Sequence, residues 1–247
     1  MSELQGKSAL VTGGNSGIGR ASAVALADLG ARVIITGRDE ARGNATVQKI
    51  RANGGKADFL RSDLRDLASV RALAVWAREL AGQVDILVNN AGIYPFVSTD
   101  ETSEQDFDSV YTLNVKVPYF LVAELAPEMA ARGHGAIINL TTMVSEFGAA
   151  GYALYGSSKA AVVLLTKAWA AEYGPKGVRV NAVSPGPTRT EGTSGFTEDL
   201  EALAGLAPAG RPGSAEEIAE AVAFLATDRA SFVYGALLPV DGGRIAV

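Results

Sequence analysis

Tyr155 and Lys159 are the two side chains whose types and spacing most directly indicate chemistry. They lie four residues apart in a stretch, 152–173, that is predicted to be helical, so both fall on one face and their polar groups can converge. A phenol has an ordinary pKa of about 10, and an adjacent ammonium group favours the phenolate and lowers that pKa. The pair therefore predicts a centre for proton transfer. The alternative is an ordinary surface pair on an amphipathic helix.

A glycine-rich turn near the N-terminus is the second feature with a chemical use. Gly13, Gly17 and Gly19 follow a short apolar run and precede a helical pattern. Glycines at such a strand-to-helix turn let the backbone approach a pyrophosphate, which the N–H groups and dipole of the helix start stabilise. A glycine-rich turn without a ligand is the alternative. The predicted phosphate-binding residues are Gly13, Asn15, Ser16, Gly17, Ile18 and Gly19.

The elements that must position these residues alternate along the whole chain, as is typical of an α/β protein. We predict seven strands, at 9–11, 32–36, 57–60, 86–89, 136–140, 179–184 and 237–240. Helices are predicted to begin at Gly17, after the capping residue Asp39, after Asp66, near Glu104, at Tyr152 and after the capping residue Ser214. No linker separates them. The predicted fold is therefore one doubly wound Rossmann domain over residues 1–247, with a parallel sheet and helices on both faces.

The stretch 187–212 has no strong periodicity and is rich in glycine and proline. It follows the sixth predicted strand, at the edge where open sheets bind ligands. We therefore expect a flexible lid over a substrate site.

Composition excludes several classes of function. The chain has 247 residues with no cysteine and one histidine, so a disulfide framework, a thiol nucleophile and a metal centre are not expected. The net charge of −5 argues against nucleic acid and anionic membranes as partners, which leaves a small molecule. No signal peptide or membrane-spanning run is visible, and we expect a cytoplasmic protein.

Four motifs in this order resemble the short-chain dehydrogenase/reductase family over almost the entire chain. They are Gly13-x-x-x-Gly17-x-Gly19, Asn89-Asn90-Ala91-Gly92, Tyr155-x-x-x-Lys159 and Pro185-Gly186. The resemblance implies the strand order 3-2-1-4-5-6-7 and a nicotinamide cofactor. It also implies hydride transfer between a carbonyl and an alcohol, usually in a homotetramer.

The end of the second predicted strand indicates which cofactor is preferred. Gly37 stands where enzymes that use NAD usually carry an acidic residue for the ribose, and Arg38 can bind a 2′-phosphate. NADP(H) is therefore favoured, and NAD(H) stays possible because neither Asn15 nor Ser16 is basic. The resemblance places Asp63 at the adenine. It further implies cofactor contacts from Leu64, Asn89, Ala91, Gly92, Tyr155, Lys159, Pro185, Gly186, Thr188 and Thr190.

The resemblance also completes the reacting centre. Asn114 is implied to extend a proton relay through water to Lys159, and Thr142 stands where relatives carry a serine that hydrogen-bonds the substrate oxygen. Threonine keeps the hydroxyl but adds a methyl group that crowds the site. Ser145 is out of register for this role. The predicted catalytic residues are Asn114, Thr142, Tyr155 and Lys159.

Apolar residues dominate the expected substrate wall, which the resemblance draws from Tyr94, Pro95, Phe96, Val144, Phe147, Tyr152 and the segment 191–206. They favour an uncharged, fairly hydrophobic ketone, aldehyde or secondary alcohol. A 3-oxoacyl-(acyl-carrier-protein) reductase is an alternative, but it needs a basic patch, for which only Arg132 and Lys176 are candidates near the expected entrance. A non-catalytic dinucleotide sensor on the same fold is another alternative. His134 is expected in a solvated loop, so a Ser-His-Asp hydrolase is disfavoured.

The helix predicted over 152–173 is apolar around more than one face. A solvent-facing helix would carry polar residues on its outer side. We therefore expect this helix to meet its two-fold mate in a dimer of dimers, as the resemblance also implies.

Overall fold

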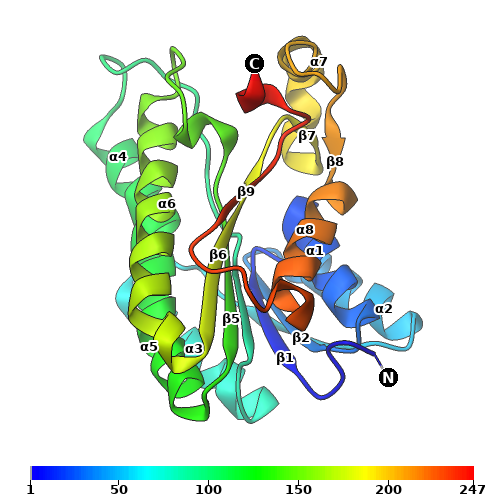
Figure 1. The fold of residues 1–247 in the computed structure, drawn as a ribbon. Helices are drawn as coiled ribbons and strands as arrows, with labels where there is room; N and C mark the ends of the chain where they lie inside the picture. The colour runs from blue at the N-terminus through cyan, green and yellow to red at the C-terminus, as the bar shows by residue number, and fades with distance from the viewer. Residues whose placement is uncertain (1) are drawn as a thin grey trace.

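The computed structural model describes residues 2–247 and contains a parallel sheet with seven strands (Figure 1). The strands are β1 (Ser8–Thr12), β2 (Arg32–Gly37), β3 (Lys56–Arg61), β4 (Ile86–Asn89), β5 (Gly135–Leu140), β6 (Val178–Pro185) and β9 (Leu237–Val240). Their order is β3-β2-β1-β4-β5-β6-β9. Each neighbouring pair is parallel. The predicted Rossmann topology is therefore confirmed, with β9 as the seventh strand of the sheet.

Helices cover both faces of this sheet (Figure 1). They are α1 (Gly17–Asp28), α2 (Glu40–Ala52), α3 (Leu67–Ala81), α4 (Glu104–Tyr111), α5 (Val117–Arg132), α6 (Ala153–Tyr173), α7 (Thr197–Ala204) and α8 (Ala215–Ala226). One apolar cluster joins α1, α2 and α8 to the first face, and another joins α3, α5 and α6 to the second. Successive residues of β1 serve opposite clusters, because side chains alternate along a strand. Ala9 and Val11 face the first cluster and Leu10 faces the second.

The sequence predicted one long helix from about Glu104, and the structure divides it. A π-helical turn, Thr112–Lys116, separates α4 from α5 and holds Asn114 fully buried. A π turn widens the helix by one residue per turn and re-aims the side chains within it, an irregularity that hydrophobic periodicity does not reveal. The local backbone at Asn114 therefore differs from the regular helix that the sequence indicated.

The segment 187–212 also contains regular structure that the sequence did not predict. β7 (Thr188–Arg189) pairs with β8 (Gly213–Ser214), and a 3₁₀ turn, Glu191–Phe196, leads into α7. A reciprocal capping box between Thr190 and Thr193 begins that turn, and its signal was hidden among the glycines and prolines. The other 3₁₀ turns are Met143–Ser145, Gly174–Lys176, Asp228–Ala230 and Arg244–Ala246.

Side-chain caps fix where four of the eight α-helices begin, namely α2, α3, α4 and α8. Asp39 and Ser214 cap α2 and α8 as predicted, and Asp66, which was predicted only to precede a helix, caps α3. Each side-chain oxygen accepts a hydrogen bond from a backbone N–H that the helix leaves free. Ser16, before α1, makes no such bond. Among residues 2–247 no helix is both long and apolar enough to cross a membrane.

Candidate functional site

A cavity of about 1390 Å³ lies at the carboxyl ends of β1, β2, β4, β5 and β6. Parallel strands deliver their following loops to the same edge of the sheet, so residues distant in sequence meet there. Most of the predicted site residues line it. They are Gly13, Asn15, Ser16, Gly17, Ile18, Gly19, Arg38, Asp63, Leu64, Ala91, Gly92, Tyr94, Phe96, Thr142, Val144, Tyr152, Tyr155, Lys159, Pro185, Gly186, Thr188 and Thr190.

Four predicted residues do not line the cavity, namely Asn89, Pro95, Asn114 and Phe147. Asn89 lies beneath it, buried, where its Nδ2 donates to Asn139 Oδ1 at 2.8 Å. Phe147 stands outside, with the Arg244 guanidinium 5.1 Å from its ring centroid. Asn114 lies behind the wall. The family pattern places these residues along the chain, but side-chain direction after a strand end depends on local turns that the pattern does not specify.

The start of α1 fits a phosphate group. Gly17 has a φ of +50°, and a Cβ on Gly19 would overlap the Gly13 carbonyl, so glycines are needed for the loop to fold back on itself. The first turn of α1 carries no acidic residue and the Ser16 side chain does not cap it, although the Gly17 N–H donates to Glu191 Oε2 at 2.9 Å. The other N–H groups of this turn and the positive end of the helix dipole suit a pyrophosphate.

Asn90 joins this loop to β4 and was missed as a site residue, although it belongs to the quoted Asn-Asn-Ala-Gly motif. Its Nδ2 donates to the carbonyl oxygens of Thr12 and Gly13 at 2.8 and 3.2 Å. The Thr12 hydroxyl in turn accepts from the backbone N–H groups of Asn90 and Ala91, both at 3.0 Å. This reciprocal set fixes the distance between the loops that follow β1 and β4.

Two further arginines beside Arg38 line the far end of the cavity, and the sequence did not single them out. Arg42, on the first turn of α2, pairs with Asp39 at 3.3 Å. Arg65 pairs with Asp63 at 2.6 Å, so the carboxylate predicted at the adenine already has a cationic partner. Arg38 is exposed and takes part in none of the ion pairs found within residues 2–247. This end of the cavity therefore offers a free guanidinium beside two paired ones.

Tyr155 faces the middle of the cavity from the first turns of α6. Burial raises the pKa of Tyr155 to about 12, and a hydrogen bond with the Thr142 side chain opposes that rise. The neighbouring phenols of Tyr94 and Tyr152 raise the pKa further. Tyr155 is therefore protonated at neutral pH, and Thr142 lies within hydrogen-bonding reach of the phenol.

Lys159 is buried one helical turn beyond Tyr155, and its Nζ donates to the Leu140 carbonyl oxygen at 2.8 Å. Burial lowers the pKa of Lys159 to about 8. Lys159 is not among the groups that shift the pKa of Tyr155, so the expected lowering by this ammonium is not seen and the pKa of Tyr155 moves upward instead. Low polarity around both groups disfavours both charged forms, so their pKa values move apart.

Asn114 supports the same wall from the π-helical turn. Its Oδ1 accepts from the Ile93 N–H at 2.9 Å, and its Nδ2 donates to the Ile93 carbonyl at 2.9 Å and to Ser158 Oγ at 3.1 Å. A Cβ built on Gly92 would lie 3.1 Å from Asn114 Oδ1 and 3.4 Å from Lys159 Nζ, so glycine keeps the space between them open. Asn114 therefore fixes the loop after β4 against α6.

Aromatic side chains form the other end of the cavity. The Phe96 ring lies 4.8 Å from Tyr152, 6.0 Å from Tyr94 and 6.3 Å from Phe196, between centroids. Tyr94 also meets Tyr155 edge-on at 6.2 Å. Leu200 and Leu203 of α7 line the cavity beside them. This end is predominantly apolar, as predicted, with the segment 187–212 supplying part of its wall.

The basic residues proposed for an acidic protein partner lie elsewhere. Arg132 ends α5, and its Nη2 donates to the Val84 carbonyl, before β4, at 2.8 Å. Lys176 precedes β6 and lies over the Tyr173 ring, 5.5 Å from its centroid. Both therefore stand at the amino ends of the strands, opposite the cavity, which corrects the expectation that they flank its entrance.

Comparison with known proteins supplies the family. A family model described as enoyl-(acyl carrier protein) reductase matches residues 13–244. An uncharacterized oxidoreductase of Thermotoga maritima is 40% identical over 252 residues, covering 99% of this chain and 99% of the relative. The solved structure of a short-chain dehydrogenase/reductase family protein is 52% identical with a TM-score of 0.92, over 99% of this chain and 100% of that one. The chain belongs to the short-chain dehydrogenase/reductase family.

Membership gives the coarse activity, that of an NAD(P)-dependent oxidoreductase. A further structure of the family, 38% identical with a TM-score of 0.93 over 99% of each chain, is assigned as an NAD(P)-dependent gluconate 5-dehydrogenase from Beutenbergia cavernae and contains NADP. The predicted nicotinamide cofactor is thereby confirmed at the level of NAD(P).

The buried ammonium leads to a prediction about stability. Because the pKa of Lys159 falls from 10.5 to about 8 on folding, the unfolded chain binds this proton more tightly, and the protein gains stability as the pH rises between those values. The substitution Lys159→Met removes the free-energy cost of burying the ammonium charge. We expect the variant to be about 2 kcal/mol more stable than the wild type at pH 7. This figure is the free-energy cost of burying the charge minus the contribution of the lost hydrogen bond to the Leu140 carbonyl.

Urea unfolding at a series of pH values measures this difference. The gain should be constant below about pH 8 and shrink toward pH 10.5, where the lysine is neutral in both states. A variant that is less stable than the wild type at pH 7, with no dependence on pH, would contradict the assignment of Lys159 as a strained, buried cation.

Proposed function

We propose that this member of the family transfers a hydride between NADP(H) and an uncharged, fairly hydrophobic ketone, aldehyde or secondary alcohol. The observation that carries the proposal is the polarity of the cavity at the carboxyl ends of the strands, which is basic at the Arg38 end and aromatic at the Phe96 end. Tyr155 and Lys159 lie between these ends. A phosphorylated dinucleotide bound at the basic end and an apolar carbonyl compound bound at the aromatic end would therefore meet at Tyr155, whose phenol can donate a proton.

Preference for NADP(H) rests on Arg38. Its exposed guanidinium lies beyond Gly37, which offers no carboxylate to a ribose diol and where an added side chain would have to displace that of Asn15. Arg42 and Arg65 add positive charge nearby, although each is paired with an aspartate. A 2′-phosphate is the group best complemented by three guanidinium groups at one edge.

The residues around Tyr155 take separate roles in the proposed reaction. When bound, the nicotinamide ring supplies or accepts the hydride. Tyr155 donates its proton to the substrate oxygen during reduction, and Thr142 donates a second hydrogen bond to the same atom. Lys159 holds the cofactor ribose, and Asn114 positions the loop at Ile93. Tyr155 should release its proton more readily beside the cationic ring of NADP⁺ than in the empty cavity.

Two alternatives receive less support. An acyl-carrier-protein reductase would need a rim of basic residues around the cavity. The two arginines of the segment 187–212 are already paired, Arg189 with Glu201 and Arg211 with Glu217. A dinucleotide sensor would have no use for a proton-holding phenol within reach of Thr142. NADPH oxidation across a panel of ketones, aldehydes and acyl thioesters separates these functions.

Replacing Arg38 tests the cofactor preference. We expect the wild type to bind NADPH more tightly than NADH, and Arg38→Ala to weaken NADPH binding by about tenfold or more while leaving NADH unchanged, because only NADPH carries the 2′-phosphate. Fluorescence titration measures both affinities. Arg71→Ala, which removes an arginine paired with Glu124 on the far side, is the matched control. Equal wild-type affinities for the two cofactors would count against the proposal.

Replacing Thr142 tests the second hydrogen-bond donor. Thr142→Val keeps the shape and deletes the hydroxyl, so kcat should fall by about 100-fold, as for loss of one donor to a developing oxyanion. NADPH affinity should stay nearly unchanged, and Thr142→Ser should retain activity. If Thr142→Val is as fast as the wild type while Tyr155→Phe is inactive, the second donor lies elsewhere, with Thr141 and Ser145 next to test.

We also propose that the protein is a homotetramer. Exposed apolar side chains occur on α4, α5 and α6, which lie side by side in Figure 1, namely Phe107, Tyr119 and Leu164. Phe232, in the turn before β9, is 98% exposed and marks a second apolar surface. Two such surfaces suit a dimer of dimers.

Light scattering at micromolar concentration tests the assembly. We expect the mass of four chains for the wild type and a lower mass for Leu164→Glu, because a charge would be buried at the interface. Val75→Glu, on α3, is the matched control and should keep the wild-type mass. A wild-type protein with the mass of one chain would refute the proposal.

A further inference from the structure

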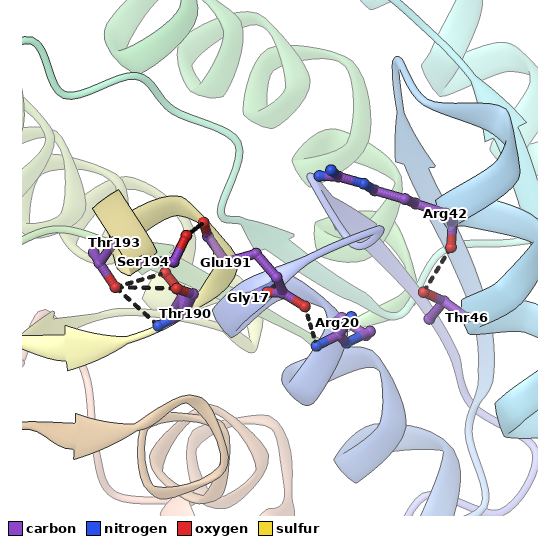
Figure 2. A network of polar contacts seen from close by, with 8 residues as sticks. All are labelled: Gly17, Arg20, Arg42, Thr46, Thr190, Glu191, Thr193 and Ser194. Carbon is purple, nitrogen blue, oxygen red and sulfur yellow. Dashed lines mark hydrogen bonds and ion pairs between the residues drawn. The ribbon is translucent and has the colours of Figure 1, made fainter. Parts of the chain in front are cut away.

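Glu191 connects the segment 187–212 to the start of α1, 174 residues away in sequence. Its Oε2 accepts from the Gly17 N–H at 2.9 Å, and its Oε1 pairs with the Arg20 guanidinium. Figure 2 shows Glu191 and Thr190 of the segment beside Gly17 and Arg20 of α1. The Glu191 carboxylate thus bridges the Gly17 backbone amide and the Arg20 side chain, one helical turn further along α1. Gly17 belongs to the glycine-rich turn 13–19, which is called the phosphate loop below.

The position of this contact relative to the cavity limits what it can do. Thr190 and Gly17 line the cavity, whereas Glu191 and Arg20 are not among its lining residues. A Cβ added to Gly17 would lie 3.3 Å from Thr190, so the segment rests directly on the loop. The carboxylate therefore closes the outside of the wall at the phosphate loop and leaves the interior space free.

The charges of the contact are compatible with a phosphate nearby. Burial acts to raise the pKa of Glu191, but the N–H groups of Glu191 and Gly17 and the Arg20 guanidinium lower it below its ordinary value. The carboxylate is thus ionised at neutral pH. The guanidinium compensates its charge, and the positive end of the α1 dipole adds to that compensation. The pair as a whole does not repel a pyrophosphate on the inner side of the wall.

We propose that Glu191 and Arg20 form a clasp that fastens the segment 187–212 over the pyrophosphate and so slows dissociation of the nicotinamide dinucleotide. Glu191 and Arg20 are positioning residues, because they act through Gly17 and Thr190 on the cavity side. The proposal rests on the proposed function only in requiring that the cavity binds NADP(H) or NAD(H). It does not depend on which of the two is preferred, since both share the pyrophosphate.

Rapid-mixing displacement of NADPH, followed by its fluorescence, measures the dissociation rate. We expect Glu191→Gln and Arg20→Met each to raise this rate by about five- to tenfold, as for loss of a charged hydrogen bond that is partly exposed. The double variant should be no faster than the faster single variant, because both substitutions break the same contact. NADH should show the same fold-change.

Three comparisons separate the clasp from a general loss of structure. Arg20→Lys keeps the charge and should restore part of the slow dissociation. Glu201→Gln removes the Arg189–Glu201 pair inside the segment without touching α1, so the rate should change less than twofold. Limited proteolysis of the cofactor-free protein should cut the segment faster in Glu191→Gln than in Glu201→Gln, with equal melting temperatures.

Unchanged NADPH dissociation in Glu191→Gln and Arg20→Met would overturn the clasp. Slower dissociation would also overturn it, since the carboxylate would then compete with the phosphate. A wild-type protein that binds neither NADPH nor NADH would refute the proposed function instead.

Discussion

The burial of the Lys159 ammonium beside Tyr155 is the constraint on which the rest of the site depends. A cation in such a place must have its donors satisfied, and the Leu140 carbonyl at the end of β5 accepts one of them at 2.8 Å. The strand end and α6 are therefore held in one register. Thr142, two residues beyond Leu140, is in this way brought to the phenol of Tyr155. The pKa values of both groups shift so as to favour their neutral forms, because burial disfavours a charge on either.

A chain of buried amides beneath the cavity maintains this arrangement. Asn89 on β4 donates to Asn139 on β5, and Asn139 donates to Thr166 on α6, each at 2.8 Å. Because buried polar groups are costly when unpaired, the chain favours one relative position of two strands and the helix that carries Tyr155. Asn114 does the same from the opposite side through Ile93 and Ser158. The reactive phenol thus stands on a frame fixed by polar contacts as well as by apolar packing.

The sequence predicted the alternation of strands and helices, the helix starts capped by Asp39 and Ser214, and the glycine-rich turn of the cavity, because periodicity, caps and glycine spacing are local signals. The sheet order and most of the remaining cavity lining were predicted from the resemblance to the family. It did not predict the π-helical turn at Asn114, the helix α7 or the charged contact of Glu191 with Gly17. These features depend on contacts between residues that are distant in sequence. The direction of the Tyr155 pKa was missed for the same reason. Spacing shows that Lys159 is near, but only the folded structure shows that Lys159 is buried and Tyr155 is half-buried.

The central claim is that the cavity keeps Tyr155 protonated until a dinucleotide fills it. Ultraviolet difference titration, with Tyr155→Phe subtracted from the wild type, measures the pKa of this phenol with and without NADP⁺. We predict a pKa of about 12 without cofactor and a fall of about two units or more when NADP⁺ is bound. An identical pKa in both states, or a phenol already ionised near neutral pH in the empty protein, would contradict the account.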